Sequence, residues 1–121
     1  MTEQRRALVV GISEYDDLSQ LLACEHDAVK MQNLLKECGY LVFDDNDSLI
    51  GKVSFVDLKK SIIKFFTEDS GPEDTLIFYF SGHGLIDGNG RHYLATSEIS
   101  RDKPYSDGYP MEDILHIVKE C

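Results

Sequence analysis

The feature that most constrains the fold is an alternation of short apolar runs with longer amphipathic segments. Three runs of β-forming residues, 6–12, 40–43 and 75–80, are typical of strands buried on both faces. Between them, segments 24–38 and 55–66 place apolar residues at steps of three and four, the spacing of one helix face. This order predicts right-handed βαβ crossovers and an α/β fold. We expect three layers, with helices on both faces of a mostly parallel sheet.

The later segments extend this pattern. The tight-turn sequence Asp87–Gly90 and the run Tyr93–Ala95 predict a small hairpin. Residues 100–109 are polar and are predicted to be irregular. A last helix is then expected, with Pro110 at or just before its first turn and an apolar face formed by Met111, Ile114, Leu115 and Val118.

Local signals mark two helix ends. Gly39 lies just past the first helix, where a C-terminal glycine belongs. Ser54, followed three residues later by Asp57, resembles an N-terminal capping box with Asp in place of Glu or Gln. Because Cys24 and Cys38 lie on the apolar stripe of the first helix, they are predicted to be small core residues.

The three main strands predict where the sheet is incomplete. Their expected spatial order is second, first, third, so the strand at 75–80 lies at one side of the sheet. The chain predicts no fourth strand beyond it, which leaves the C-terminal edge of the sheet exposed. An unpaired edge favours association. We therefore expect the isolated chain to form a homodimer or to aggregate through this edge.

Composition indicates a single domain over residues 1–121 and argues against several classes of protein. The chain is long enough to bury a core. No apolar run approaches the roughly 20 residues of a membrane span, and no signal-peptide cleavage site follows the N-terminus, so we expect no membrane association and a cytoplasmic protein. The formal net charge of -10 argues against a nucleic-acid partner.

Cysteine and acidic residues provide no convincing metal site. The three cysteines, Cys24, Cys38 and Cys121, form no C-x-x-C pair and do not combine with the histidines into a zinc pattern. The odd number and the missing secretory signal favour a reducing compartment. The acidic segment Asp44–Asp47 lacks the glycine and glutamate of a calcium loop, which favours a solvated loop. No cofactor is expected.

His83 is the strongest candidate for a chemical role. It follows the strand at 75–80 and lies between two glycines. Ligands bind at the carboxyl ends of parallel strands, so His83 should face a crevice, with residues 13–15 beside it. A base is favoured over a metal ligand, and a base needs a nucleophile. Ser81 is near, but no Gly-x-Ser-x-Gly elbow is present. The alternative is a turn histidine that only ends the strand.

Four segments together resemble the caspase/metacaspase superfamily of cysteine peptidases. They are residues 7–12 followed by Tyr15, the helix start Leu22–Ala28, residues 35–40, and Phe78–Gly84. The resemblance spans essentially the whole chain. The sequence Tyr-Phe-Ser-Gly-His-Gly, at this distance after the Asp-Ala helix, is its specific part.

The resemblance implies roles for three residues. His83 matches the catalytic histidine, and the backbone N–H of Gly84 matches half of the oxyanion hole, which stabilises the negative oxygen formed during peptide cleavage. Asp27 matches the acidic residue that helps metacaspases bind a substrate arginine or lysine. Caspases instead place an arginine a few residues before this position, and residues 19–22 contain none. Cleavage after a basic residue is therefore favoured over cleavage after aspartate. The alternative for Asp27 is a first-turn carboxylate that complements the helix dipole.

The nucleophile is where the chain departs from the family pattern. In this superfamily the catalytic cysteine follows a fourth strand, with the histidine about 50 residues upstream. Cys121 falls short of that spacing, closes a predicted helix and lacks the flanking motif, while Cys24 and Cys38 precede the histidine. The resemblance therefore implies that this chain is the N-terminal portion of a longer catalytic domain.

The sequence thus predicts a caspase-like cysteine endopeptidase with a peptide or protein substrate. Its partner would be the missing C-terminal portion or a small subunit that supplies the cysteine. Calcium activation is a family property for which no site is identified. The alternatives are a catalytically inactive caspase-like interaction or regulatory module and an unrelated flavodoxin-like ligand-binding domain. Against the last, residues 11–15 contain one glycine rather than a glycine-rich phosphate loop.

Overall fold

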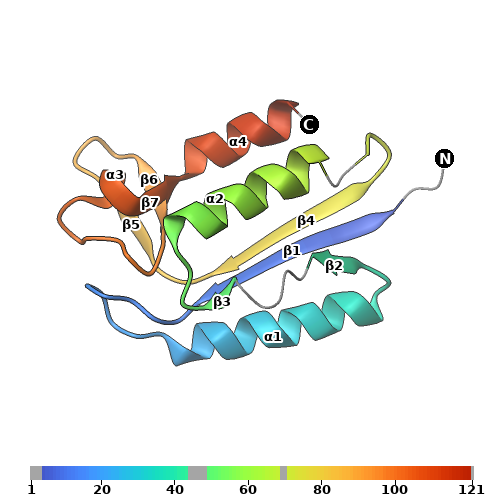
Figure 1. Ribbon diagram of the computed structural model, residues 1–121, viewed down its shortest axis with the longest axis horizontal. Coiled ribbons are helices and arrows are strands. Elements are labelled where there is room, and N and C mark those ends of the chain that lie inside the picture. The colour runs from blue at the N-terminus through green and yellow to red at the C-terminus, as the bar shows by residue number, and fades with distance from the viewer. Residues whose placement is uncertain (1–3, 44–48, 69–70, 121) are drawn as a thin grey trace.

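A computed structural model describes residues 4–43, 49–68 and 71–120 (Figure 1). Strand β1 (Arg5–Ile12) is the centre of a parallel sheet. Along one edge it pairs first with β2 (Leu41–Phe43) and then with β3 (Ile50–Gly51), and along the other edge with β4 (Thr75–Ser81). The predicted order of the three main strands is confirmed. Strand β3 was not predicted, because two residues are too few to show a periodicity.

Helices cover both faces of this sheet, as predicted (Figure 1). One face carries α1 (Leu22–Glu37), and the other carries α2 (Phe55–Ile63) and α4 (Met111–Glu120), with a π-helical turn at Lys64–Glu68 continuing α2. Because successive side chains of a strand point to opposite faces, β1 contributes to two cores. Ala7 and Val9 pack with α1, while Leu8, Val10 and Ile12 pack with the helices of the other face.

The prediction that the third main strand is buried on both faces is wrong in degree. Leu76, Phe78 and Phe80 do pack against one core, and Ile77 and Tyr79 against the other. None of the residues of β4 is fully buried, however. Among the described residues β4 pairs only with β1. The side chains of β4 therefore lack neighbours from a second strand along its other edge. This is the open edge that the sequence predicted.

Both predicted helix ends are confirmed. Gly39 follows α1 with φ of 88°, a conformation that favours glycine. The hydroxyl of Ser54 accepts a hydrogen bond from the backbone N–H of Asp57 at 3.1 Å and caps α2. The core role predicted for Cys38 is wrong, because α1 ends at Glu37 and the Cys38 side chain is exposed. Cys24 is half-buried.

The C-terminal part forms a small antiparallel sheet at one end of the molecule (Figure 1). The hairpin of β5 (Gly84–Ile86) and β6 (His92–Ala95) confirms the prediction. Residues 100–109 are more regular than expected, since they include α3 (Pro104–Asp107) and β7 (Gly108–Pro110), which pairs with β6.

The predicted apolar face of α4 is largely wrong. Ile114 is buried and Ile117 packs against the core, whereas Met111, Leu115 and Val118 are exposed. The helix does begin directly after Pro110, as expected.

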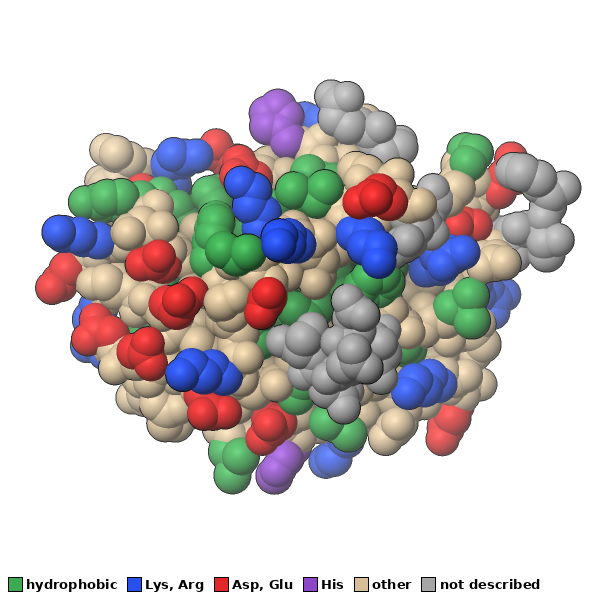
Figure 2. Space-filling model, viewed as in Figure 1, with side chains coloured by type: hydrophobic (Ala, Val, Ile, Leu, Met, Phe, Trp, Pro, Cys, Tyr) green, Lys and Arg blue, Asp and Glu red, His purple; other side chains and the backbone are tan. Residues whose placement is uncertain are grey.

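Acidic, basic and hydrophobic side chains are interspersed on the face shown in Figure 2. Within the described ranges, none of the helices has both the length and the apolar composition needed to span a membrane. The acidic segment 44–47 lies outside the described residues.

Candidate active site

The candidate site lies at the carboxyl ends of β1 and β4, where the topology predicted it. His83 comes two residues after β4 and directly before β5, and its side chain is half-buried. The loop 13–21, which leaves the end of β1, lies beside it, as expected for residues 13–15. Residues 64 and 68 positions apart in the sequence meet there through hydrogen bonds.

The ring of His83 is held by a backbone carbonyl. Its Nε2 atom lies 2.9 Å from the carbonyl oxygen of Ser19. A carbonyl can only accept a hydrogen bond, so Nε2 carries the proton. In a neutral imidazole this leaves Nδ1 as the unprotonated nitrogen. The arrangement therefore orients a ring whose Nδ1 atom can accept a proton.

The backbone of His83 is held by a side chain. Its N–H donates to the hydroxyl of Tyr15 at 2.9 Å, and this hydroxyl donates to the carbonyl of Ala95 at 3.2 Å. The two rings also meet edge to face, with centroids 4.7 Å apart. Burial raises the pKa of Tyr15 to about 12, although the hydrogen bond from His83 opposes the shift. The hydroxyl therefore remains protonated at neutral pH and can donate to Ala95.

Gln20 fixes the loop that presents these groups. Its side-chain carbonyl accepts from the N–H of Tyr15 at 3.0 Å, and its amide donates to the carbonyl of Tyr15 at 2.6 Å. The N–H of Leu21 also closes the loop onto the carbonyl of Ser13 at 2.8 Å. The loop is therefore tied to itself on both sides of Tyr15.

Gly84 is the first residue of β5 and is exposed to solvent. Register pairs Gly84 with Leu94, while Ala95 donates its N–H to the carbonyl of His83 at 2.9 Å. Hydrogen-bonded and non-hydrogen-bonded pairs alternate along an antiparallel ladder, so Gly84 and Leu94 form a non-hydrogen-bonded pair. The N–H of Gly84 is thus directed away from β6 and can donate to another group.

The structure does not join the other predicted residues to His83. Asp27 is exposed on α1, and its carboxylate has no hydrogen bond or ion pair within the described part of the chain. Neither of the two described cysteines, Cys24 and Cys38, hydrogen-bonds to His83. Cys121 lies outside the described residues. The site as described therefore contains an oriented imidazole and a free backbone donor, without a thiol hydrogen-bonded to His83.

Three contributions to the site were missed by sequence reasoning: the carbonyl of Ser19, the hydroxyl of Tyr15 and the amide of Gln20. The topology did place Tyr15 near His83. A backbone carbonyl, however, has no sequence signal of its own, because every residue carries one.

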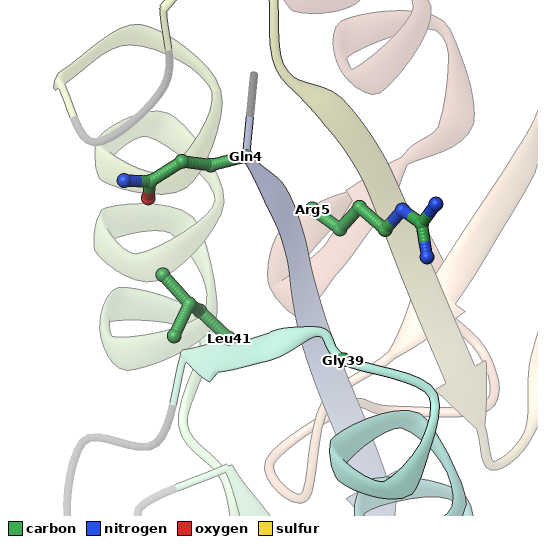
Figure 3. Close-up of a pocket in the computed structure, with 4 residues that line it drawn as sticks. All are labelled: Gln4, Arg5, Gly39 and Leu41. Atoms are coloured by element: carbon green, nitrogen blue, oxygen red, sulfur yellow. The ribbon is translucent and has the colours of Figure 1, made fainter. Parts of the chain in front are cut away.

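Two of the cavities lined by described residues differ in their position relative to the candidate site. Figure 3 shows the residues that line the first, a cavity of about 410 Å³ at the amino ends of β1 and β2: Gln4, Arg5, Gly39 and Leu41. The candidate site lies at the opposite, carboxyl ends of the strands. An apolar cavity of about 480 Å³ adjoins Gly84 and is lined by β5, β6 and Met111. No group of three or more potential metal ligands is found among the described residues.

Comparison with known proteins identifies the family of this chain. The sequence model of the caspase domain matches residues 4–118. Metacaspase-1 of Candida glabrata is 33% identical over 94 residues, covering 69% of this chain and 23% of the relative. Metacaspase-1B of Aspergillus clavatus is 29% identical over 124 residues, covering 97% of this chain and 27% of the relative. For Metacaspase-1 of Debaryomyces hansenii the identity is 27%, with 93% of this chain and 28% of the relative covered. The chain thus spans less than a third of the length of these curated relatives.

Proposed function

This chain belongs to the caspase domain family of cysteine peptidases, and we propose that it supplies the base and half of the oxyanion hole of an endopeptidase site. The observation that carries the proposal is the orientation of His83. Its Nε2–H is engaged by the carbonyl of Ser19, so Nδ1 is the nitrogen left to take a proton. A general base works only when its accepting atom is oriented toward the group that it deprotonates.

The proposed reaction is attack of a thiolate on a peptide carbonyl. His83 takes the thiol proton at Nδ1, and the sulfur then bonds to the carbonyl carbon. The N–H of Gly84, directed away from β6, donates to the oxygen that becomes negative. The imidazolium returns its proton to the leaving amine, and water hydrolyses the acyl-enzyme.

The cysteine of this mechanism comes from outside the chain, either from a continuation or from a separate subunit. The open edge of β4 supports this part of the proposal. A parallel strand added there would end beside His83, because the carboxyl ends of parallel strands meet at one end of a sheet. The same unpaired edge supports a homodimer of the isolated chain.

The preference for arginine or lysine at the cleavage site rests on Asp27. Its carboxylate is exposed and unpaired among the described residues, so it is available to a cationic side chain. The relatives named above are metacaspases, which supports the same preference. The alternative of a first-turn carboxylate that complements the helix dipole is wrong, because α1 begins at Leu22 and Glu25, not Asp27, is the acidic residue of its first turn.

The test uses the protein in which this chain is followed by its continuation. We expect cleavage of Arg and Lys peptides over an Asp peptide, and a loss of roughly 10³-fold or more in kcat/KM for His83→Ala. His116→Ala, at an exposed position of α4, is the matched control and should be active. Unchanged cleavage by His83→Ala would refute the role of His83. Asp27→Asn should raise KM for Arg peptides, and an unchanged KM would refute the role of Asp27 in substrate binding.

A second candidate function is a catalytically inactive module that binds partners or regulates an active relative. The observation that favours it is the lack of a thiol hydrogen-bonded to His83 among the described residues. This candidate predicts that a peptide electrophile labels no cysteine even when the continuation is present. Labelling that requires His83 would exclude it.

Two further proposals concern the cellular compartment of the protein and its activation by calcium. We place the protein in the cytoplasm, because its cysteines suit a reducing compartment. Calcium activation remains a family-based proposal, and adding calcium or a chelator during the peptide assay would decide it.

A further inference from the structure

The hairpin next to His83 contains an unusual rung. His83 and Ala95 lie opposite each other, because the register of β5 and β6 pairs Gly84 with Leu94. In such a position two residues normally exchange two direct hydrogen bonds. Only one direct bond is present here, from the N–H of Ala95 to the carbonyl of His83 at 2.9 Å.

The hydroxyl of Tyr15 takes the place of the second bond. It accepts from the N–H of His83 and donates to the carbonyl of Ala95, so it bridges the two groups that would otherwise bond directly. The hydroxyl therefore lies between the His83 N–H and the Ala95 carbonyl, 2.9 Å from the His83 nitrogen and 3.2 Å from the Ala95 oxygen. The ladder becomes regular again at Gly84, where β5 begins.

We propose that Tyr15 is a positioning residue of the peptidase site, whose hydroxyl inserts between His83 and Ala95 and sets where both His83 and the Gly84 N–H stand. The inference rests on the proposed function, because it assigns a role within that reaction. Tyr15 exchanges no proton with the nucleophile or the substrate in this mechanism. Its hydroxyl acts through the backbone N–H of His83, and its ring lies edge to face with the imidazole.

The surroundings of Tyr15 fit this role. The residue is buried, and Gln20 holds its N–H and its carbonyl, so the hydroxyl is aimed from a fixed loop. The same loop offers the Ser19 carbonyl to the imidazole ring. One loop therefore holds His83 at two points, the backbone and the ring.

Because Gly82 has no side chain, the Tyr15 hydroxyl has room to lie beside it. A Cβ atom on Gly82 would lie 2.7 Å from the Tyr15 hydroxyl and 3.0 Å from the ring of Phe80. A side chain at this position would therefore push against the inserted oxygen. Gly82→Ala is therefore a second way to disturb the hydrogen bonds that the Tyr15 hydroxyl makes with His83 and Ala95, without changing Tyr15 itself.

The test is Tyr15→Phe in the protein that carries its continuation. Without the hydroxyl, His83 and Ala95 lose their bridge or close onto each other, which moves the base. We expect kcat for an Arg peptide to fall roughly 10²-fold with KM within about 2-fold, because misplacement of a catalytic group affects the chemical step. The His83 amide, observed by NMR with a [15N]histidine label, should change its chemical shift and exchange faster.

The matched control is Tyr93→Phe on β6. It removes one hydrogen bond of a buried tyrosine, from its hydroxyl to Asp87 at 2.8 Å, within the same hairpin, whereas Tyr15→Phe removes two. The expected result is kcat within about 2-fold of wild type and an unchanged His83 amide. An equal loss of kcat in both variants would overturn the proposal, because it would indicate general loosening of the hairpin.

Gly82→Ala keeps the proposal testable if Tyr15→Phe does not fold. It should reproduce the fall in kcat and the shift of the His83 amide. Wild-type kcat and an unshifted amide in a folded Tyr15→Phe or Gly82→Ala protein would overturn the inference. The amide measurement needs no peptidase activity. An inactive wild-type protein would therefore refute the proposed function while the NMR result still decides whether Tyr15 positions His83.

Discussion

Gly11 of β1 should not tolerate even a methyl group, because α1 packs directly onto the strand there. A Cβ atom on Gly11 would overlap the Cβ of Ala28 and lie 2.8 Å from the carbonyl oxygen of Cys24. Neither atom can be moved by a change of rotamer, since one is backbone and the other is the first atom of its side chain. Strand and helix have to separate, or β1 has to shift within the sheet.

The cost of Gly11→Ala follows from this geometry. Overpacking of a core typically costs about 1–3 kcal/mol, and the two fixed partners place Gly11→Ala near ~3 kcal/mol. This is a large part of the roughly 5–15 kcal/mol that stabilises a domain. At about 4 °C per kcal/mol for a chain of this size, the melting temperature should fall by roughly 10 °C.

Urea unfolding of wild type and variant, followed by circular dichroism, measures this difference. Gly88→Ala is the control, since a Cβ there meets nothing within 4 Å, and it should change stability little. Ala28→Gly should recover part of the loss when combined with Gly11→Ala, although the clash with Cys24 remains. A Gly11→Ala variant as stable as wild type would refute the reasoning, as would a double variant without coupling.

Three further changes test local features by urea unfolding. Gly39→Ala should cost about 1 kcal/mol or more because of the left-handed φ of 88°, and a neutral result would contradict that conformation. Ser54→Ala should cost about 1 kcal/mol through loss of the α2 cap, whereas Ser54→Asp should retain stability. The pKa of Asp74 is lowered mainly by the hydrogen bond from the Gly71 N–H, with the N–H of Gln4 and the guanidinium of Arg6 adding to it. Stability from this carboxylate is therefore complete above its unfolded pKa and lost as pH falls through the folded pKa, so Asp74→Asn should destabilise at pH 7 and progressively less as the pH falls through the folded pKa. An effect of Asp74→Asn that does not change with pH would exclude the charge as the cause.

Much of the fold could be predicted because its signals are local. The run in β1 and the stripe of α1 each fit one period over many residues, and the ends at Gly39 and Ser54 follow from the chemistry of single residues. By contrast, β3 and β7 are two and three residues long, which is too short for a period to be recognised. Their pairing depends on neighbours that are distant in the sequence.

Errors of burial have a different origin. The stripe of α4 predicted Leu115 and Val118 as core residues, yet both are exposed, because a helical period does not say which neighbour is present to cover a face. The half-burial of β4 has the same cause. Its sequence is that of a strand with neighbours on both sides, and the described chain supplies only β1.

The candidate site shows where sequence reasoning stops. The Gly-His-Gly pattern and the topology predicted His83 at the carboxyl ends of the strands. Which imidazole nitrogen is left to accept a proton, however, depends on which one is hydrogen-bonded. That choice is made by a carbonyl of Ser19, and the position of the peptide by a hydroxyl of Tyr15, both from the loop after β1. The imidazole of His83 is therefore oriented within this chain. Since the open edge of β4 ends beside His83, whatever pairs with that edge would deliver its own residue to an imidazole already oriented. Nucleophile and base would then meet through strand pairing alone, without any rearrangement of the histidine.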